Sequence, residues 1–167
     1  MGTRVRSGRP WTAIVLAALV LVLDLAVAPA AHAAAGDSPQ YCTLDLTTHD
    51  WSCTTSPATA ARMVRPAAEG AGSILLGRFY DETNLDGSGA YFNVTAASGC
   101  DANADLDYSV GSMPSGWNDR VSSFQGYNGC QVKLWQNGGF GGASYGPVSY
   151  AYTVGPLDNQ ASSITFY

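Results

Sequence analysis

The sequence predicts an all-β fold in which one supersecondary unit occurs twice. Glycine is abundant, with 19 residues in a chain of 167, and only 13% of the residues are charged, which is typical of short strands joined by tight turns. From residue 74 onward, short apolar and aromatic runs alternate with turn-rich segments. A hairpin motif and a hexapeptide occur in the same order in two units of about forty to fifty residues each, which indicates an internal repeat.

The first 33 residues have the layout of a secretory signal peptide. Three arginines precede an apolar run over residues 11–28, and an A-x-A pattern of small residues ends at Ala33. A membrane anchor is the alternative, because the run is close to the shortest length that spans a bilayer. Asp24 inside the run and the alanine-rich exit favour cleavage. We therefore predict that residues 1–33 are removed and that the mature protein is secreted.

The mature chain is acidic and poor in charge. It keeps five of the eight basic residues and twelve of the thirteen acidic ones, which gives a net charge of −7. A negative chain with a single lysine is a poor partner for nucleic acid or for an anionic membrane. We expect neither as a partner.

Residues 34–72 are predicted to form a disulfide-closed hairpin followed by a linker. The stretch YCTLDLTTHDWSC (residues 41–53) alternates apolar and polar residues around a polar tip, which is typical of a β-hairpin. Residues 56–72 are rich in alanine and other small residues. We expect a short helix that ends by Pro66, and then the linker.

Four cysteines remain in the mature chain, and disulfides are the expected state of cysteine in a secreted protein. Three pairings are possible, of which the sequential one is the simplest: Cys42 with Cys53, and Cys100 with Cys130. The sequence argues against a zinc site, because no C-x-x-C occurs and His49 is the single histidine of the mature chain.

Residues 73–167 contain the two repeated units. Strand signals lie at residues 74–80, 90–94, 130–135 and 143–148. The hairpin motif consists of an aromatic residue, four residues, an apolar or aromatic residue, one residue and a glycine: Tyr80, Leu85 and Gly87 in the first copy, and Trp135, Phe140 and Gly142 in the second. A glycine at the same offset suggests a backbone position that needs positive φ or close approach.

Each unit then ends in a polar hexapeptide before an apolar strand. Hexapeptide 1 (residues 118–123) reads NDRVSS, and hexapeptide 2 (residues 158–163) reads DNQASS. A polar turn that caps the last strand would explain one copy, because Asn, Asp and Ser side chains bond to local backbone. Two copies, each behind a matching hairpin motif, indicate more than a turn.

These motifs resemble those of the βγ-crystallin superfamily. Its Greek-key motifs carry an aromatic-x4-aromatic-x-Gly hairpin, and microbial members add the calcium signature N/D-N/D-x-x-S/T-S. Both hexapeptides match this signature in full, and the hairpin motif matches in full at its second copy, with Leu85 in place of the aromatic in the first. The resemblance implies a sandwich of two Greek keys over residues 73–167.

The resemblance also implies two calcium sites, each sharing oxygens from both hexapeptides. The first set comprises a backbone carbonyl, a hydroxyl, an amide and a hairpin-loop carbonyl: Arg120, Ser122, Asn159 and Thr83. The second set comprises the equivalent groups: Gln160, Ser162, the Asp119 side chain and Gly138. With one ionised ligand in total, binding is expected to be weak, on the order of 10⁻⁴–10⁻³ M.

A closer resemblance is to small secreted bacterial proteins of this fold that are grouped with a microbial metalloproteinase-inhibitor family. It is carried by the C-x-L-D-L opening and by VGSMPSGWNDRVSSF (residues 110–124). It implies inhibition of an extracellular metalloprotease. If the protein is such an inhibitor, we expect the inserted loop to be GSMPSGW (residues 111–117), which contains Met113 and Pro114 and in which proline would reduce the entropy cost of ordering. The alternative is a non-enzymatic toxin or a module that binds a cell surface or cell wall.

No pattern in the sequence favours an enzyme. His49 lies in a predicted hairpin tip, far from any nucleophile motif. Asp81 and Glu82 are neighbouring carboxylates at a hairpin turn, where a structural role is the simpler explanation. The aromatic side chains are expected in the core or in cross-strand pairs: Tyr91, Phe92, Trp135, Tyr150, Tyr152 and Phe166.

An acidic loop at residues 101–112 has part of the pattern of a helix-loop-helix calcium site. Asp101, Asn103 and Asp105 occupy its first, third and fifth positions. Leu106 stands where the pattern requires glycine, and Ser112 where it requires glutamate. We therefore expect a solvated acidic loop.

Overall fold

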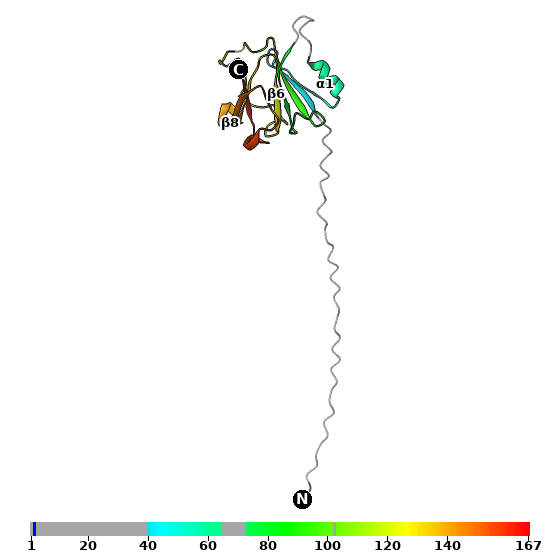
Figure 1. Ribbon diagram of the computed structural model, residues 1–167. Helices are drawn as coiled ribbons and strands as arrows, with labels where there is room; N and C mark the ends of the chain where they lie inside the picture. Colours follow the sequence, from blue (N-terminus) through cyan, green and yellow to red (C-terminus); the bar gives the residue numbers. More distant parts are fainter. Residues whose placement is uncertain (1, 3–39, 65–72, 102) are drawn as a thin grey trace. The chain divides into compact units, whose positions relative to one another are not determined.

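The computed structural model describes residues 2, 40–64, 73–101 and 103–167 (Figure 1). The predicted signal peptide, apart from Gly2, and residues 65–72 of the predicted linker lie outside the described residues. In the described part of the chain, no helix is both long and apolar enough to cross a membrane.

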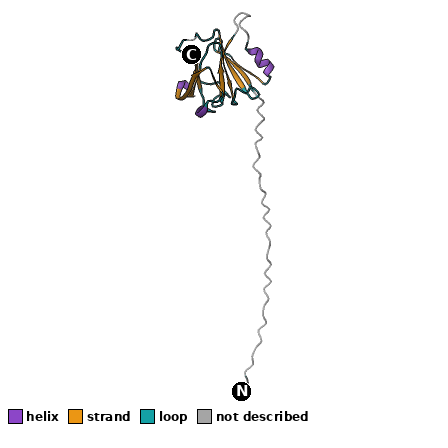
Figure 2. Ribbon diagram, viewed as in Figure 1, coloured by secondary structure: helices purple, strands orange, loops and turns teal. Residues whose placement is uncertain are grey.

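The described chain folds into two β-sheets (Figure 2). The first sheet has six strands in the order β2 (Trp51–Thr54), β1 (Tyr41–Asp45), β4 (Tyr91–Ala96), β3 (Ile74–Tyr80), β6 (Ser123–Gly126) and β9 (Tyr150–Ala151). The second has four, in the order β5 (Tyr108–Val110), β10 (Ser163–Phe166), β7 (Val132–Asn137) and β8 (Gly141–Val148). Strand β8 and helix α1 (Pro57–Met63) lie on opposite flanks of this domain (Figure 1).

The strand order confirms the predicted sandwich of two Greek keys. The first unit places β3, β4 and β6 in the first sheet but sends β5 to the second, where it pairs with β10. The second unit places β7, β8 and β10 in the second sheet and sends β9 to the first, where it pairs with β6. The two units therefore exchange their third strands and are related by pseudo-twofold symmetry.

The N-terminal hairpin is part of the first sheet. Strands β1 and β2 are antiparallel with Cys42 opposite Cys53, and the predicted disulfide joins these two residues. Strand β1 also pairs in parallel with β4, from Tyr41 opposite Tyr91 onward. Strand β4 lies between β1 and β3, and all six of its residues are buried.

The predicted helix is confirmed as α1. The Ser56 hydroxyl accepts a hydrogen bond from the Thr59 N–H and caps its N-terminus, with Pro57 in the first turn. Ala60 is fully buried, and the helix contacts β1 and β2. The helix ends at Met63, three residues before Pro66.

The core is an aromatic cluster between the sheets. The Phe92 ring stacks on Phe79 with centroids 4.7 Å apart and contacts Trp117 at 4.8 Å. Phe79 also meets Phe166 of the second sheet edge-on at 6.2 Å. These rings are fully buried, so each contributes on the order of 2–3 kcal/mol through loss of apolar surface from water.

Two of the aromatic residues expected in the core or in cross-strand pairs have exposed side chains. Tyr150 and Tyr152 are 55% and 56% exposed, and their rings pack against each other at 5.4 Å. The reason is that β9 is a two-residue edge strand that pairs on one side with β6. Tyr150 still pairs across the sheet with Gln125, as expected, whereas Tyr152 lies outside the strand.

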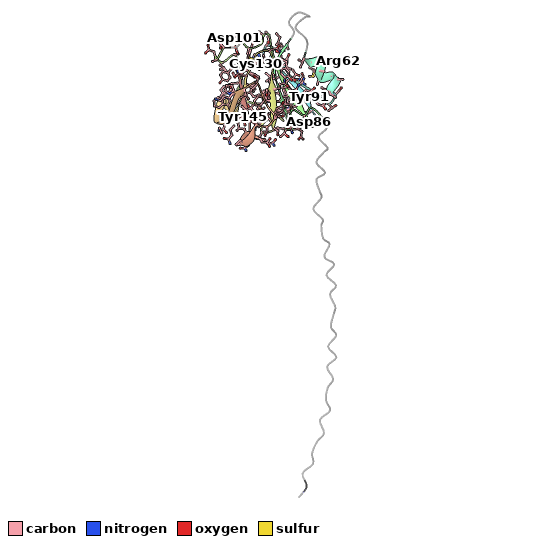
Figure 3. All side chains as sticks on the ribbon, in the orientation of Figure 1. Arg62, Asp86, Tyr91, Asp101, Cys130 and Tyr145 are labelled. Atoms are coloured by element: carbon pink, nitrogen blue, oxygen red, sulfur yellow. A yellow bond between two sulfur atoms is a disulfide. The ribbon has the colours of Figure 1, made fainter. Side chains whose placement is uncertain are left out.

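The second predicted disulfide, Cys100–Cys130, is also confirmed. It joins the segment before β5 to the start of β7, so it connects the two Greek keys. Asp101 and Cys130 lie towards one end of the domain, whereas Asp86 of the first hairpin loop lies towards the other (Figure 3). The acidic loop after Cys100 is therefore remote from that hairpin loop.

Candidate functional site

The two hexapeptides lie against each other. The Asp119 N–H donates to the Ala161 carbonyl at 3.0 Å, and the Asn159 N–H donates to the Val121 carbonyl at 3.1 Å. Each bond has its symmetry equivalent in the other, because Asp119 and Asn159 occupy the second position of their hexapeptides. Both hexapeptides therefore belong to one pseudo-symmetric centre.

The second position of each hexapeptide has left-handed backbone. Asp119 has φ 56° and Asn159 has φ 55°. Asp and Asn enter this region at lower cost than other non-glycine residues, because their short polar side chains bond locally. The pattern requires asparagine or aspartate at its second position for two reasons: the residue must adopt the left-handed backbone, and it must supply a side-chain oxygen.

The last serine of each hexapeptide fastens a hairpin loop. The Ser123 hydroxyl donates to the Glu82 carbonyl at 2.6 Å and accepts from the Leu85 N–H at 3.1 Å. In the second unit, the Ser163 hydroxyl makes the equivalent pair of bonds, to the Asn137 carbonyl at 2.6 Å and from the Phe140 N–H at 3.1 Å. The hairpin motif and the hexapeptide are therefore parts of one structural unit.

These bonds explain why the hairpin motif tolerates leucine. Leu85 and Phe140 both have positive φ, 59° and 64°, and both are half-buried. What the two positions share is a backbone N–H held by a buried serine. The side chain needs to be apolar there, and an aromatic ring is not required for the loop to close.

Hexapeptide 2 faces an open cavity of about 340 Å³. The Ser162 hydroxyl donates to Oδ1 of Asp119 at 3.2 Å, so a carboxylate from one hexapeptide meets a hydroxyl from the other. The lining is entirely polar in residue type: Asp119, Gln136, Asn137, Asn159, Gln160 and Ser162. The predicted second ligand set thus has its Asp119, Gln160 and Ser162 together here, with Gly138 in the adjoining 3₁₀ turn.

The first ligand set is arranged differently. Ser122 is 4% exposed, and among the described residues no hydrogen bond joins its hydroxyl to Asn159. The Thr83 carbonyl accepts a hydrogen bond from the Asp86 N–H at 3.3 Å within the loop. The Arg120 guanidinium forms an ion pair with Asp81 at 3.0 Å.

The donors around the cavity fit a calcium ion of low affinity. Calcium prefers six to eight hard oxygen ligands, and carboxylate, hydroxyl, amide and carbonyl oxygens all occur here. In the described part of the chain, no group of three or more His, Cys, Asp or Glu side chains is placed to hold a metal. Asp119 is the one carboxylate of the lining, so the attraction for a cation is small.

Sequence reasoning missed three residues of this centre. Gln136 and Asn137 line the cavity, and Asp81 pairs with Arg120. Gln136 and Asp81 share a signal, because each directly follows the first aromatic residue of its hairpin motif. That offset would have placed both beside the hexapeptides.

No protein-family model and no curated protein matches the sequence. The fold is similar to that of several solved structures. The N-terminal domain of Protein S is 20% identical over 55% of this chain and 94% of its own, with a TM-score of 0.41. A βγ-crystallin domain from Clostridium beijerinckii is 19% identical over 55% of this chain and 97% of its own, with a TM-score of 0.41. A βγ-crystallin from Ciona intestinalis is 22% identical over 53% of this chain and 94% of its own, with a TM-score of 0.39.

These likenesses concern the fold alone. The protein is a sandwich of two Greek keys, extended by a disulfide-closed hairpin on its first sheet.

Proposed function

We propose that the protein is a secreted, non-enzymatic domain that binds calcium through its paired hexapeptides. The observation that carries the proposal is the meeting of the Asp119 carboxylate and the Ser162 hydroxyl, 3.2 Å apart, at an open cavity lined by oxygen donors. When bound there, calcium would act as a cross-link between the two Greek keys, because its ligands come from both.

The ligands of this site are the side chains of Asp119 and Ser162 and the carbonyl of Gln160, with Gly138 supplying the hairpin-loop carbonyl. The left-handed backbone at Asp119 turns its carboxylate towards hexapeptide 2. The buried Ser163 holds the loop that carries Gly138. Water would complete the coordination, since calcium takes more ligands than this set provides.

Calcium binding is tested by thermal unfolding of the mature protein with and without calcium. A ligand that binds the native state alone raises the free energy of unfolding by about 2.7 kcal/mol at a hundred times its dissociation constant. We expect the melting temperature to rise with millimolar calcium. A melting temperature that does not respond would refute the proposal and would leave the hexapeptides as structural turns.

Secretion is supported by residues of two kinds. The N-terminal sequence has the layout of a signal peptide, and both disulfides suit an oxidising compartment. Expression of the full chain should release a product that begins close to residue 34. Mass spectrometry of that product is the measurement, and an uncleaved, cell-associated chain would contradict the proposal.

Inhibition of an extracellular metalloprotease stays a prediction of the sequence. Met113 of the expected inhibitory loop is 5% exposed, and its N–H donates to the Ser162 carbonyl at 2.8 Å. Pro114 beside it is half-buried. Because the Met113 side chain is not presented to a protease cleft, our proposal does not include this loop. Titration against a thermolysin-like protease decides the matter: stoichiometric loss of activity would restore the inhibitory role.

A further inference from the structure

Among the differences between the two halves of the pseudo-symmetric centre, one replaces a charged pair of side chains by a neutral pair. The third position of hexapeptide 1 is Arg120, and that of hexapeptide 2 is Gln160. The residue after the first aromatic of the hairpin motif is Asp81 in the first unit and Gln136 in the second. A charged pair in one half therefore stands where a neutral pair stands in the other.

Both pairs make the same contacts. In the second half, Gln136 Nε2 donates to Gln160 Oε1 at 3.2 Å, and Gln160 Nε2 donates to the Pro156 carbonyl at 2.9 Å. In the first half, an Arg120 Nη atom donates to Asp81 Oδ2 at 3.0 Å. The other Nη donates at 3.4 Å to the carbonyl four residues earlier in the chain, as Gln160 does. Arg120 thus occupies the structural place of Gln160.

The guanidinium is held from several sides. Its side chain is 29% exposed, it pairs with a carboxylate that is 18% exposed, and its carbon lies 5.1 Å from the centre of the Trp117 ring. Asp81 keeps a second buried oxygen, Oδ1, that has no hydrogen-bond partner among the described residues. The first half therefore already holds a fixed cation beside a carboxylate.

We infer that Arg120 acts as a built-in cation for the first half, so that the protein binds one calcium ion, at the Asp119–Ser162 half, instead of two. This inference rests on the proposed function. A fixed positive charge repels a second cation and retains Asp81, the carboxylate that would otherwise attract it. The burial of Ser122 agrees with this, because the equivalent Ser162 of the second half is half-buried.

The test counts the ions released on unfolding. At saturating calcium, the free energy of unfolding rises with the logarithm of calcium concentration, and the slope divided by RT equals the number of ions bound to the native state. Urea unfolding is followed by circular dichroism in about 10–100 mM calcium at constant ionic strength. This readout suits weak sites because it does not require tight binding.

We expect a slope of about one ion for the wild type and about two for Arg120→Gln, which copies Gln160. The double variant Arg120→Gln with Asp81→Gln copies the whole neutral pair and keeps the test valid if an unpaired Asp81 impairs folding. Arg62→Gln is the charge-matched control, because Arg62 is exposed on α1, and its slope should stay at one.

A further variant assigns the new ion to the first half. Adding Ser122→Ala to Arg120→Gln removes the predicted hydroxyl ligand of the first half, which does not line the cavity of the other half, and the slope should return to about one. A wild-type slope of two, or a slope of one in both Arg120 variants, would overturn the inference and leave the calcium proposal intact. A wild-type slope of zero would overturn both.

Discussion

The carboxylate of Asp119 is the group on which calcium binding depends most. Asp119→Asn is the sharpest perturbation, because asparagine tolerates the left-handed backbone, as Asn159 does in the other hexapeptide. It also keeps an oxygen that can accept the bond from Ser162. The substitution therefore removes one charge and the acceptor of an exposed hydrogen bond from Asn118 Nδ2.

The expected magnitude follows from that charge. A unit charge about 2.4 Å from a divalent ion gains about 3.5 kcal/mol even at the dielectric constant of water. Lost hydration of the carboxylate offsets part of this, so we expect binding to weaken about tenfold, or by about 1.4 kcal/mol. If the wild-type dissociation constant is about 10⁻⁴ M, stabilisation in about 10 mM calcium falls from about 2.7 to about 1.4 kcal/mol.

Differential scanning calorimetry measures this effect. For a domain of roughly 130 residues, 1 kcal/mol corresponds to about 3–4 °C in Tm. The calcium-dependent rise in Tm should therefore be about 9 °C in the wild type and about 5 °C in Asp119→Asn. Asp105→Asn, in the exposed acidic loop, is the control with the same loss of charge and should keep the full rise. Equal rises in the wild type and Asp119→Asn, or an equal loss in the control, would refute the reasoning.

Three further predictions concern stability. Replacing both Cys100 and Cys130 by alanine opens a loop with a sequence separation of 30 and should lower the free energy of unfolding by about 3–4 kcal/mol, measured by urea unfolding. Ser163→Ala leaves a loop carbonyl and an N–H without their partner and should cost about 1–3 kcal/mol; an unchanged Tm would mean that the loop closes without this serine. Phe92→Ala should cost about 3–5 kcal/mol, whereas the exposed Tyr152→Ala should stay within about 0.5 kcal/mol, and equal costs would contradict the assigned core.

Local patterns were sufficient to predict the repeated architecture. The hairpin motifs, the hexapeptides and the strands around them are each encoded within about ten residues, and the structure fastens them together through Ser123 and Ser163. Both disulfides followed from the order of the cysteines in the chain. The match at Leu85 was partial, but its backbone is held in the same way as that of Phe140.

Contacts between residues far apart in the sequence could not be predicted from local sequence patterns. Strand β1 pairs in parallel with β4, which lies fifty residues further along the chain at Thr43 opposite Asn93. The ion pair of Arg120 with Asp81 joins residues 39 positions apart. The stretch around Met113 has the glycine, serine and proline of an exposed loop, yet its backbone bonds to Ser162 and its side chain enters the core.

The exchange of third strands between the units has a consequence for folding kinetics. Strand β5 pairs with β10, which is the last strand in sequence order, so this pairing cannot form before β10 is present. Strand β9 pairs with β6, and the second hairpin lies between them in the sequence. Such pairings raise the relative contact order, and all-β domains of this kind fold in milliseconds to seconds because loop closure precedes most native contacts. Neither unit can complete its sheet alone, so a chain that is still being synthesised would complete its fold only after β10 has been added.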